Sequence, residues 1–129
     1  MTLKELSQLY HLKGEIRDIK SRISELKELS TDTSAKITGM PHSGRKKDKI
    51  GSIVAEIEYY KSILKKRLKE YTAELIRLNN YISACPDSLT RQILEYRFID
   101  GMSWNQVAAH IGITEASAKM IAYRYIKEN

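Results

Sequence analysis

Residues 103–119 read SWNQVAAHIGITEASAK and specify the architecture of the C-terminal third of the chain. Ser103 and Thr114 are N-cap residue types at the start of two helical patterns. Gly112 between them tolerates the positive φ of a tight turn, and Ala108 lets two helices approach closely. Apolar residues have the spacing needed to fill the space between the helices: Val107, Ile111, Ile113 and Ile121. The stretch therefore predicts a helix-turn-helix.

Another helix is expected upstream of this pair. Cys85-Pro86 interrupts the preceding pattern, Asp87 or Ser88 can cap a new helix, and Asp100-Gly101 is a typical end signal. Residues 86–129 are therefore predicted to form a three-helix domain. A helical pair without a role in DNA binding has the same local signals and remains an alternative.

Core positions in this domain carry one departure from the usual pattern. Ala118 occupies a place where a β-branched residue is common, so Trp104 or Met120 is expected to fill the space. Tyr123 and Tyr125 can pack on the first helix of the domain, and we expect at least one of them to do so.

The first half of the chain carries two apolar heptad seams. They predict two long helices that fold back as an antiparallel coiled-coil hairpin over residues 1–85. The fold class is therefore all-α, a hairpin followed by a helix-turn-helix head. The first seam comprises Leu9, Leu12, Ile16, Ile19, Ile23 and Leu26. The second comprises Ile50, Val54, Ile57, Lys61, Leu64, Leu68, Tyr71, Leu75, Leu78 and Ile82.

The second seam contains one polar residue, Lys61, of a kind that can set helix register. Further apolar residues lie just off this seam, and they either widen the core of the hairpin or form a dimer surface. A bare two-helix hairpin buries only a narrow stripe, so both readings are open. The residues concerned are Tyr59, Tyr60, Ile63, Ile76 and Tyr81.

A basic loop is expected between the two long helices, at about residues 30–49. Serine and threonine favour turns over helix, and Met40-Pro41 disfavours helix. The segment ends in four basic residues that either contact DNA phosphates or keep the hairpin solvated: Arg45, Lys46, Lys47 and Lys49.

The chain of 129 residues has 22 basic and 16 acidic side chains, a net charge of +6. Residues 30–49 carry a net +3, whereas residues 86–129, with five basic and five acidic side chains, carry none. A basic balance suggests polyanion partners. No apolar run approaches the length of a membrane span, and the N-terminus lacks a signal-peptide pattern. We therefore expect a soluble, cytoplasmic protein without a membrane partner.

Residue types that support catalysis or metal binding are sparse and badly spaced for either. His11, His42, His110 and Cys85 show no metal-ligand spacing, and the single cysteine excludes an internal disulfide. Phosphate-binding glycine loops and serine elbows are also missing. The sequence predicts a protein that is not an enzyme and holds neither a metal nor a cofactor.

Two C-terminal stretches resemble region 4 of bacterial sigma factors. Residues 89–104, LTRQILEYRFIDGMSW, match its approach to the helix-turn-helix, and residues 113–119 match the start of its recognition helix. Upstream, Gly39-Met40-Pro41, the basic loop and Asp48-Lys49-Ile50 are similar to small phage and prophage transcriptional regulators of the ArpU and RinA type. The resemblance spans nearly the whole chain. It implies a phage-encoded regulator in the bacterial cytoplasm, and not a complete sigma factor, because the other sigma regions are missing.

The predicted recognition helix, residues 115–127, would enter the major groove of double-stranded DNA. Lys119 can donate to guanine, Glu115 can accept from cytosine, and Ala116 can touch a thymine methyl group. Helical spacing places five candidate base contacts on one side, and the sigma resemblance implies the first four: Glu115, Ala116, Lys119, Met120 and Tyr123. The candidate backbone contacts are Ser103, Thr114, Arg124 and Lys127.

Because residues 86–129 are neutral, a single module should bind DNA weakly. A homodimer through the hairpin would present two recognition helices to a two-fold site. Two other functions stay open. A phage small terminase subunit for DNA packaging combines the same parts in a larger ring, and a sigma-like module could bind RNA polymerase or another protein.

Overall fold

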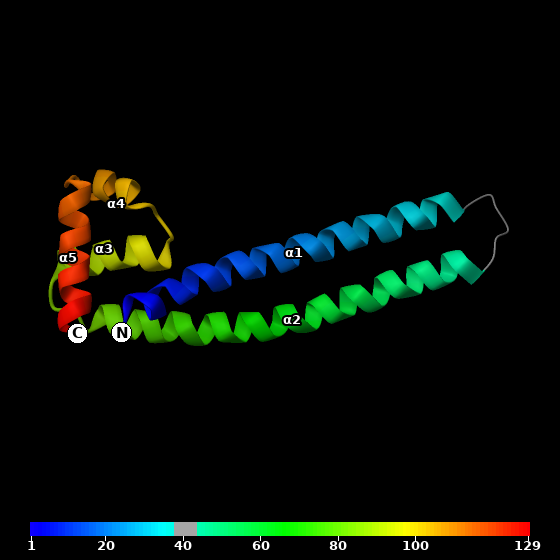
Figure 1. The fold of residues 1–129 in the computed structure, drawn as a ribbon, viewed down its shortest axis with the longest axis horizontal. Helices are drawn as coiled ribbons and strands as arrows, with labels where there is room; N and C mark the ends of the chain where they lie inside the picture. The colour runs from blue at the N-terminus through cyan, green and yellow to red at the C-terminus, as the bar shows by residue number, and fades with distance from the viewer. Residues whose placement is uncertain (38–43) are drawn as a thin grey trace. The chain divides into compact units, whose positions relative to one another are not determined.

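The computed structural model describes the backbone of residues 1–37 and 44–129 and the side chains of residues 1–31 and 49–129. Over this part the chain is all-helical, as predicted, and has no strand. None of the helices described has a stretch long and apolar enough to cross a membrane. The elements in Figure 1 are α1 (Leu3–Ile37), α2 (Gly44–Ser83), α3 (Ser88–Leu94), the π-helical turn η1 (Glu95–Ile99), α4 (Trp104–Ile111) and α5 (Glu115–Glu128).

The chain divides into two compact units, which are described separately. Unit 1 comprises Met1–Lys13 and Glu70–Asn129, and unit 2 comprises Gly14–Lys69. These units do not coincide with the expected domains 1–85 and 86–129. Leu6 of α1 and Leu78 of α2 are buried in the core of unit 1, so the ends of both long helices belong to it.

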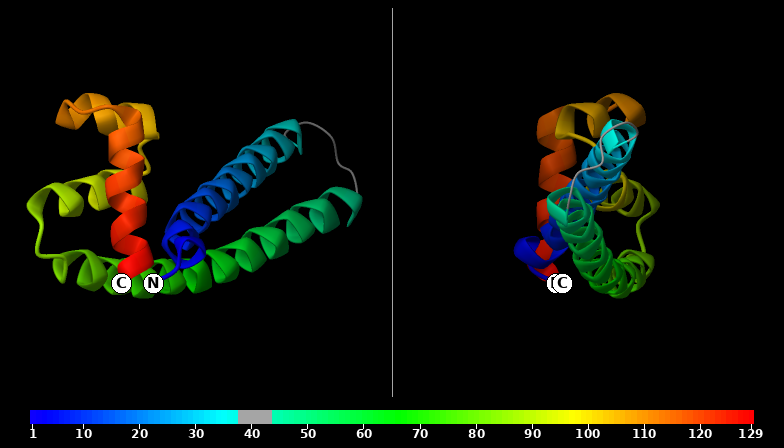
Figure 2. Two further views of the ribbon diagram at one scale, coloured as in Figure 1. Left: turned by 60° about the vertical axis from the view of Figure 1, so that its left-hand side comes forward. Right: turned by 90° about the vertical axis from the view of Figure 1, so that its right-hand side faces the viewer.

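Unit 1 contains a core built from every one of its helical segments. α5 packs against both α3 and α4, as Figures 1 and 2 show. Burying one large apolar side chain contributes roughly 1.5–3 kcal/mol. The buried members are Leu6, Leu9, Leu78, Ile82, Ile93, Leu94, Phe98, Trp104, Val107, Ala118 and Ala122.

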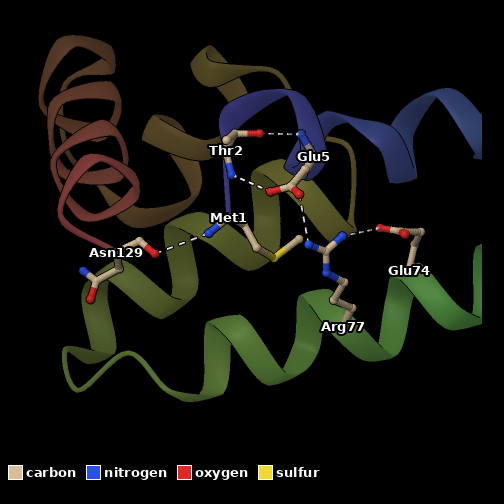
Figure 3. Close-up of polar contacts among 6 residues, drawn as sticks. All are labelled: Met1, Thr2, Glu5, Glu74, Arg77 and Asn129. Atoms are coloured by element: carbon tan, nitrogen blue, oxygen red, sulfur yellow. Dashed lines mark hydrogen bonds and ion pairs between the residues drawn. The ribbon is translucent and has the colours of Figure 1, made fainter.

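The beginning of α1 is fixed by a capping box. The Glu5 carboxylate accepts from the Thr2 N–H at 2.8 Å, and the Thr2 hydroxyl accepts from the Glu5 N–H at 3.3 Å. The same carboxylate accepts from Arg77 of α2 at 3.0 Å, and the N-terminal amine donates to the carbonyl oxygen of Asn129 at 3.3 Å (Figure 3). These contacts tie both chain ends into unit 1.

Unit 2 has a narrower core between its segments of α1 and α2. Ile19 and Ile23 of α1 pack against Ile53 and Ile57 of α2. The first predicted seam is confirmed from Leu9 to Ile23, where all its members are buried, and Leu26 is half-buried.

The second seam is wrong at three positions. Val54, Lys61 and Leu68 are exposed, whereas Ile53 is buried and Tyr60 half-buried. Each residue along a helix turns by about 100°, so the packed face lies one residue earlier at Val54 and at Lys61. The rotation buries larger apolar side chains, because it places Ile53 on the packed face instead of Val54 and Tyr60 instead of Lys61.

Lys61 therefore does not set the register of the packed face. Its amine lies 3.8 Å from Glu58 on the exposed side of α2. The apolar residues just off the second seam were expected either to widen the core or to form a dimer surface, and they divide between these two positions. Tyr60, Ile63 and Tyr81 pack on the cores of their own units, whereas Tyr59 and Ile76 are exposed.

The predicted loop over residues 30–49 is largely helical. α1 continues to Ile37 and α2 already begins at Gly44, so Asp48 lies inside α2. Thr31 shows how a hydroxyl residue is accommodated, because its Oγ1 donates to the Lys27 carbonyl at 3.0 Å without breaking the helix. The expectation of a turn at Gly39-Met40-Pro41 lies outside the described residues.

Candidate nucleic-acid interface

The start of α4 is fixed by Ser103, as predicted. The Ser103 hydroxyl accepts from the Gln106 N–H at 3.2 Å, and the Gln106 side chain accepts from the Ser103 N–H at 3.0 Å. This reciprocal pair is a capping box. It occupies the backbone N–H of Ser103, so a phosphate would meet the exposed hydroxyl at this position.

The turn between α4 and α5 has the predicted geometry. Gly112 has φ 87°, in the left-handed region that a residue with a side chain enters at a cost. The N–H groups of Gly112 and Ile113 both donate to the Ala108 carbonyl, at 2.8 and 3.1 Å. These bonds end α4 within one residue and start the chain toward α5.

Small side chains allow α4 and α5 to pack closely. Ala108 of α4 is 5% exposed, and Ala118 and Ala122 of α5 are fully buried. The space beside Ala118 was expected to be filled by Trp104 or Met120. Trp104 is buried in the core of unit 1, whereas Met120 is 56% exposed. This packing leaves the opposite side of α5 facing solvent.

The candidate base-reading residues share that outer side of α5. Four of them are exposed, and Lys119 is half-exposed. The Lys119 amine lies 3.4 Å from the Glu115 carboxylate, four residues earlier. An exposed pair of this kind contributes only about 0–1 kcal/mol, so a base can displace either partner. The set is Glu115, Ala116, Lys119, Met120 and Tyr123.

Tyr123 also makes an edge-on contact with the buried ring of Trp104. Its ring lies 5.6 Å from that of Trp104, and the Arg97 guanidinium lies 5.0 Å from the Trp104 ring centre. Arg97 also donates to the Met102 carbonyl at 2.9 Å. The edge-on contact leaves 42% of Tyr123 exposed.

Tyr125, on the other side of α5, is the tyrosine that packs inward. Its ring lies 5.5 Å from the ring of Tyr81 on α2. Burial raises the pKa of both phenols, and the neighbouring Cys85 adds to this effect. Tyr125 packs against the core of unit 1, but its ring contact is with α2, so packing on the first helix of the C-terminal domain stays a prediction.

Three candidate backbone contacts lie along α5. The Thr114 hydroxyl accepts from the Ser117 N–H at 3.2 Å and donates to the Ser117 hydroxyl at 2.8 Å. Within α5 this cap leaves the N–H groups of Glu115 and Ala116 free to meet an anion. Arg124 and Lys127 are exposed and form no ion pair with any residue of the described part.

The four basic residues expected in the loop fall in the first turns of α2. Lys49 is exposed there. The side chains of Arg45, Lys46 and Lys47 lie outside the described ones.

Sequence reasoning missed two residues that lie near Ser103. A cleft of about 380 Å³ beside Ser103 is lined by His11 of α1 and by Arg97 of η1. Both side chains carry N–H donors, so they are additional candidates for phosphate contact. His11 and Ser103 are far apart in the sequence, and only the core of unit 1 brings them together. No local spacing could therefore have predicted the pair.

α3 is held by a buried threonine and a charged cap. The Asp87 carboxylate accepts from the Thr90 hydroxyl at 2.6 Å and from the Thr90 N–H at 3.1 Å, which lowers the pKa of Asp87. Arg91 donates to the Cys85 carbonyl at 2.7 Å. These contacts fix the start of α3 and tie it to the turn at Cys85.

The described part of the chain has no group of three or more metal-ligating side chains. His110 packs edge-on against Tyr96 at 4.9 Å, and Cys85 is buried. His42 lies outside the described residues.

The two units differ in net charge. Unit 1 has eight basic and eight acidic side chains, whereas unit 2 has fourteen basic and eight acidic ones. The whole net charge of +6 therefore belongs to unit 2. The outer face of α5 is part of the neutral unit.

No protein-family model matches the chain. Comparison with curated proteins and with solved structures likewise gives no significant match.

Proposed function

We propose that this protein is a sequence-specific DNA-binding transcriptional regulator of the phage or prophage type, acting in the cytoplasm of a bacterial host. In this proposal α4 and α5 form a helix-turn-helix, and α5 is the recognition helix that enters the major groove. The resemblance to sigma region 4 and to regulators of the ArpU and RinA type motivates the assignment.

The observation that carries the proposal is the exposed outer face of α5. Five candidate base-reading side chains share this face, while capped helix ends and a left-handed glycine hold the α4–α5 pair. Recognition helices read base edges from such a face near their N-terminus. The unpaired N–H groups at the start of α5 and the cations of Arg124 and Lys127 would meet phosphates.

Dimerisation through the hairpin formed by α1 and α2 completes the proposal. Unit 1 is neutral, so a single copy would gain little from phosphate neutralisation. Two copies would present two recognition helices to one two-fold site. Val54, Tyr59 and Leu68, which are 48%, 61% and 40% exposed, supply apolar surface on unit 2 for this contact.

A protein-binding module is the second candidate, and the neutrality of unit 1 favours it. In that case α5 would contact RNA polymerase or another protein. A DNA-packaging subunit of the small terminase type is separated from both by native mass, because it would assemble as a ring of many copies rather than a dimer.

Selection of bound duplexes from a random pool tests the proposal, followed by affinity measurements on the selected and on scrambled sequences. Lys119→Gln should relax sequence preference at one position, with a loss of about 1–3 kcal/mol on the selected site alone. Lys127→Gln is the matched control on the same helix. It should weaken both duplexes equally and lower the salt slope by about 1.

Failure to enrich any sequence, together with binding to purified RNA polymerase, would replace the DNA proposal by the protein-binding one. Equal effects of the two substitutions on both duplexes would show that α5 does not read bases.

A further inference from the structure

Residues 61–69 of α2 read KSILKKRLK and form the most basic continuous stretch of unit 2 that the structure describes. The stretch contains five cations and no acidic residue. Lys61, Lys65 and Lys69 recur every four residues, so they lie along one side of the helix, about 6 Å apart along its axis. We call these three residues, with the adjacent Lys66, the lysine stripe.

The lysine stripe faces away from the packed side of α2. All four lysines are exposed, whereas Ile63 and Leu64 are half-buried against the core of unit 2. Arg67, the fifth cation, is committed elsewhere, because it donates to Glu15 of α1 at 2.9 Å. The stripe is therefore a solvent-facing feature and not part of the helix packing.

Acidic side chains of the protein neutralise little of the positive charge of the lysine stripe. Lys61 lies 3.8 Å from Glu58, while Lys65, Lys66 and Lys69 form no ion pair with any described residue. Like charges four residues apart on a helix repel one another and destabilise it. Such an arrangement becomes favourable when an anion with several charges binds along it.

We propose that the lysine stripe binds the phosphate backbone of double-stranded DNA without reading its sequence. Lysine ammonium groups act as flexible point charges on phosphates, whereas base recognition favours side chains with fixed paired donors. Single-stranded nucleic acid is a poorer fit, because residues 61–69 contain no aromatic side chain on which bases could stack, and the exposed Tyr59 beside them offers only one ring.

The site lies in unit 2 and does not depend on whether α5 reads bases. It supplies the nonspecific electrostatic affinity that the neutral unit 1 lacks. Neutralising phosphates releases counterions, so each contact contributes about 0.9 to the slope of log affinity against log salt.

Titration of a labelled, random-sequence duplex of about 30 base pairs with the full chain tests this inference. Lys65→Gln/Lys69→Gln should lower the salt slope by about 1.8, two contacts at about 0.9 each. Between about 50 and 200 mM KCl the loss of affinity should then be about twelvefold smaller than in the unmodified protein. Glutamine keeps helix propensity close to that of lysine, and circular dichroism checks that the fold is retained.

Lys20→Gln/Lys27→Gln is the matched control, since it removes two exposed charges from α1 in the same unit. Residues 14–29 around them hold four basic and four acidic side chains, so this variant should keep the original slope. Lys65→Arg/Lys69→Arg should keep it as well. An unchanged slope for the glutamine variant, or an equal loss in the control, would overturn the inference.

The probe has no selected sequence, so its outcome is separate from that of the proposed function. A reduced slope would support the stripe even in a protein that enriches no sequence.

Discussion

Unit 1 and unit 2 differ in what holds them and in what they carry. Unit 1 buries a core contributed by all its helices and has no net charge. Unit 2 buries one cluster of four isoleucines among its described residues and carries the entire net charge of +6. Unit 1 therefore provides the larger packed core, whereas unit 2 provides the positive charge that attracts anions.

The difference extends to how the helices are specified. α3, α4 and α5 have 7, 8 and 14 residues, lengths at which isolated helices are marginal. Each begins at a residue whose side chain caps it: Asp87, Ser103 and Thr114. The long helices of unit 2 instead depend on a repeating apolar face. The three short helices thus depend on capped ends, whereas α1, which is also capped, and α2 depend mainly on their apolar faces.

Truncating a core side chain should give the largest difference in unfolding free energy between the two units. Leu94→Ala removes a fully buried side chain from unit 1 and should cost about 2–5 kcal/mol of unfolding free energy. Ile57→Ala in unit 2 should fall at or below the lower end of that range, because Ile57 is 8% exposed in a two-helix core that can relax. Denaturant titration followed by circular dichroism measures both costs.

Fluorescence of the single tryptophan, Trp104, assigns the Leu94 effect to unit 1. Equal costs for the two substitutions would mean that the isoleucine cluster is as rigidly packed as the core of unit 1, and the comparison would not hold.

Two glycine substitutions should change stability in opposite directions. Gly112→Ala forces a side chain into φ 87° and should destabilise unit 1 by about 1–2 kcal/mol. Gly51→Ala lies within α2 and should stabilise unit 2 by about 0.5–1 kcal/mol, since alanine favours helix. An added Cβ meets no atom within 4 Å at either position, so the pair isolates the backbone effect.

Thermal melts of the two glycine variants are the measurement. A stabilising Gly112→Ala would contradict the left-handed turn between α4 and α5.

Acid should loosen unit 1 by a smaller amount. The pKa of Glu5 is lowered by the Thr2 N–H and then by Arg77, and that of Asp87 by the Thr90 hydroxyl. Lowered folded-state pKa values contribute stability above the ordinary values of 4.5 and 3.8, and this stability is lost as pH falls through the folded-state values. Stability should therefore decline below about pH 4.5.

Glu5→Gln/Asp87→Asn removes both titrations, while asparagine still caps a helix. Its stability, followed by Trp104 fluorescence, should depend less on pH between about 5 and 3. An acid response identical to that of the original protein would place the sensitive carboxyls elsewhere.

Local signals in the sequence predicted the helix ends and the turn around the candidate site. The Ser103 and Thr114 caps, the left-handed Gly112 and the exposed face of α5 follow from residue type and helical spacing, and the structure has all four. The serine- and threonine-rich segment after residue 29 was a less reliable signal. Such hydroxyls can bond back within a helix, as Thr31 does, so composition did not distinguish a loop from a helix.

Longer-range relationships could not be predicted in the same way. Sequence placed Lys61 in the seam because a strict four-and-three repeat passes through it, but packing selected Tyr60. It also divided the chain at residue 85, whereas Leu6 and Leu9 belong to the core of unit 1. His11 beside Ser103 and Tyr123 against Trp104 depend on the same core.

The sequence by itself determined the helical class, the helix ends in the C-terminal third, the apolar face of α1 and the net charge. The first three depend on residues within a few turns of one another, and the net charge depends on composition alone. Only the tertiary structure decided which side of α2 is buried, where the compact units divide and which lysines remain exposed. Those features depend on the burial of side chains far apart in the chain, for which a single helical repeat carries no information.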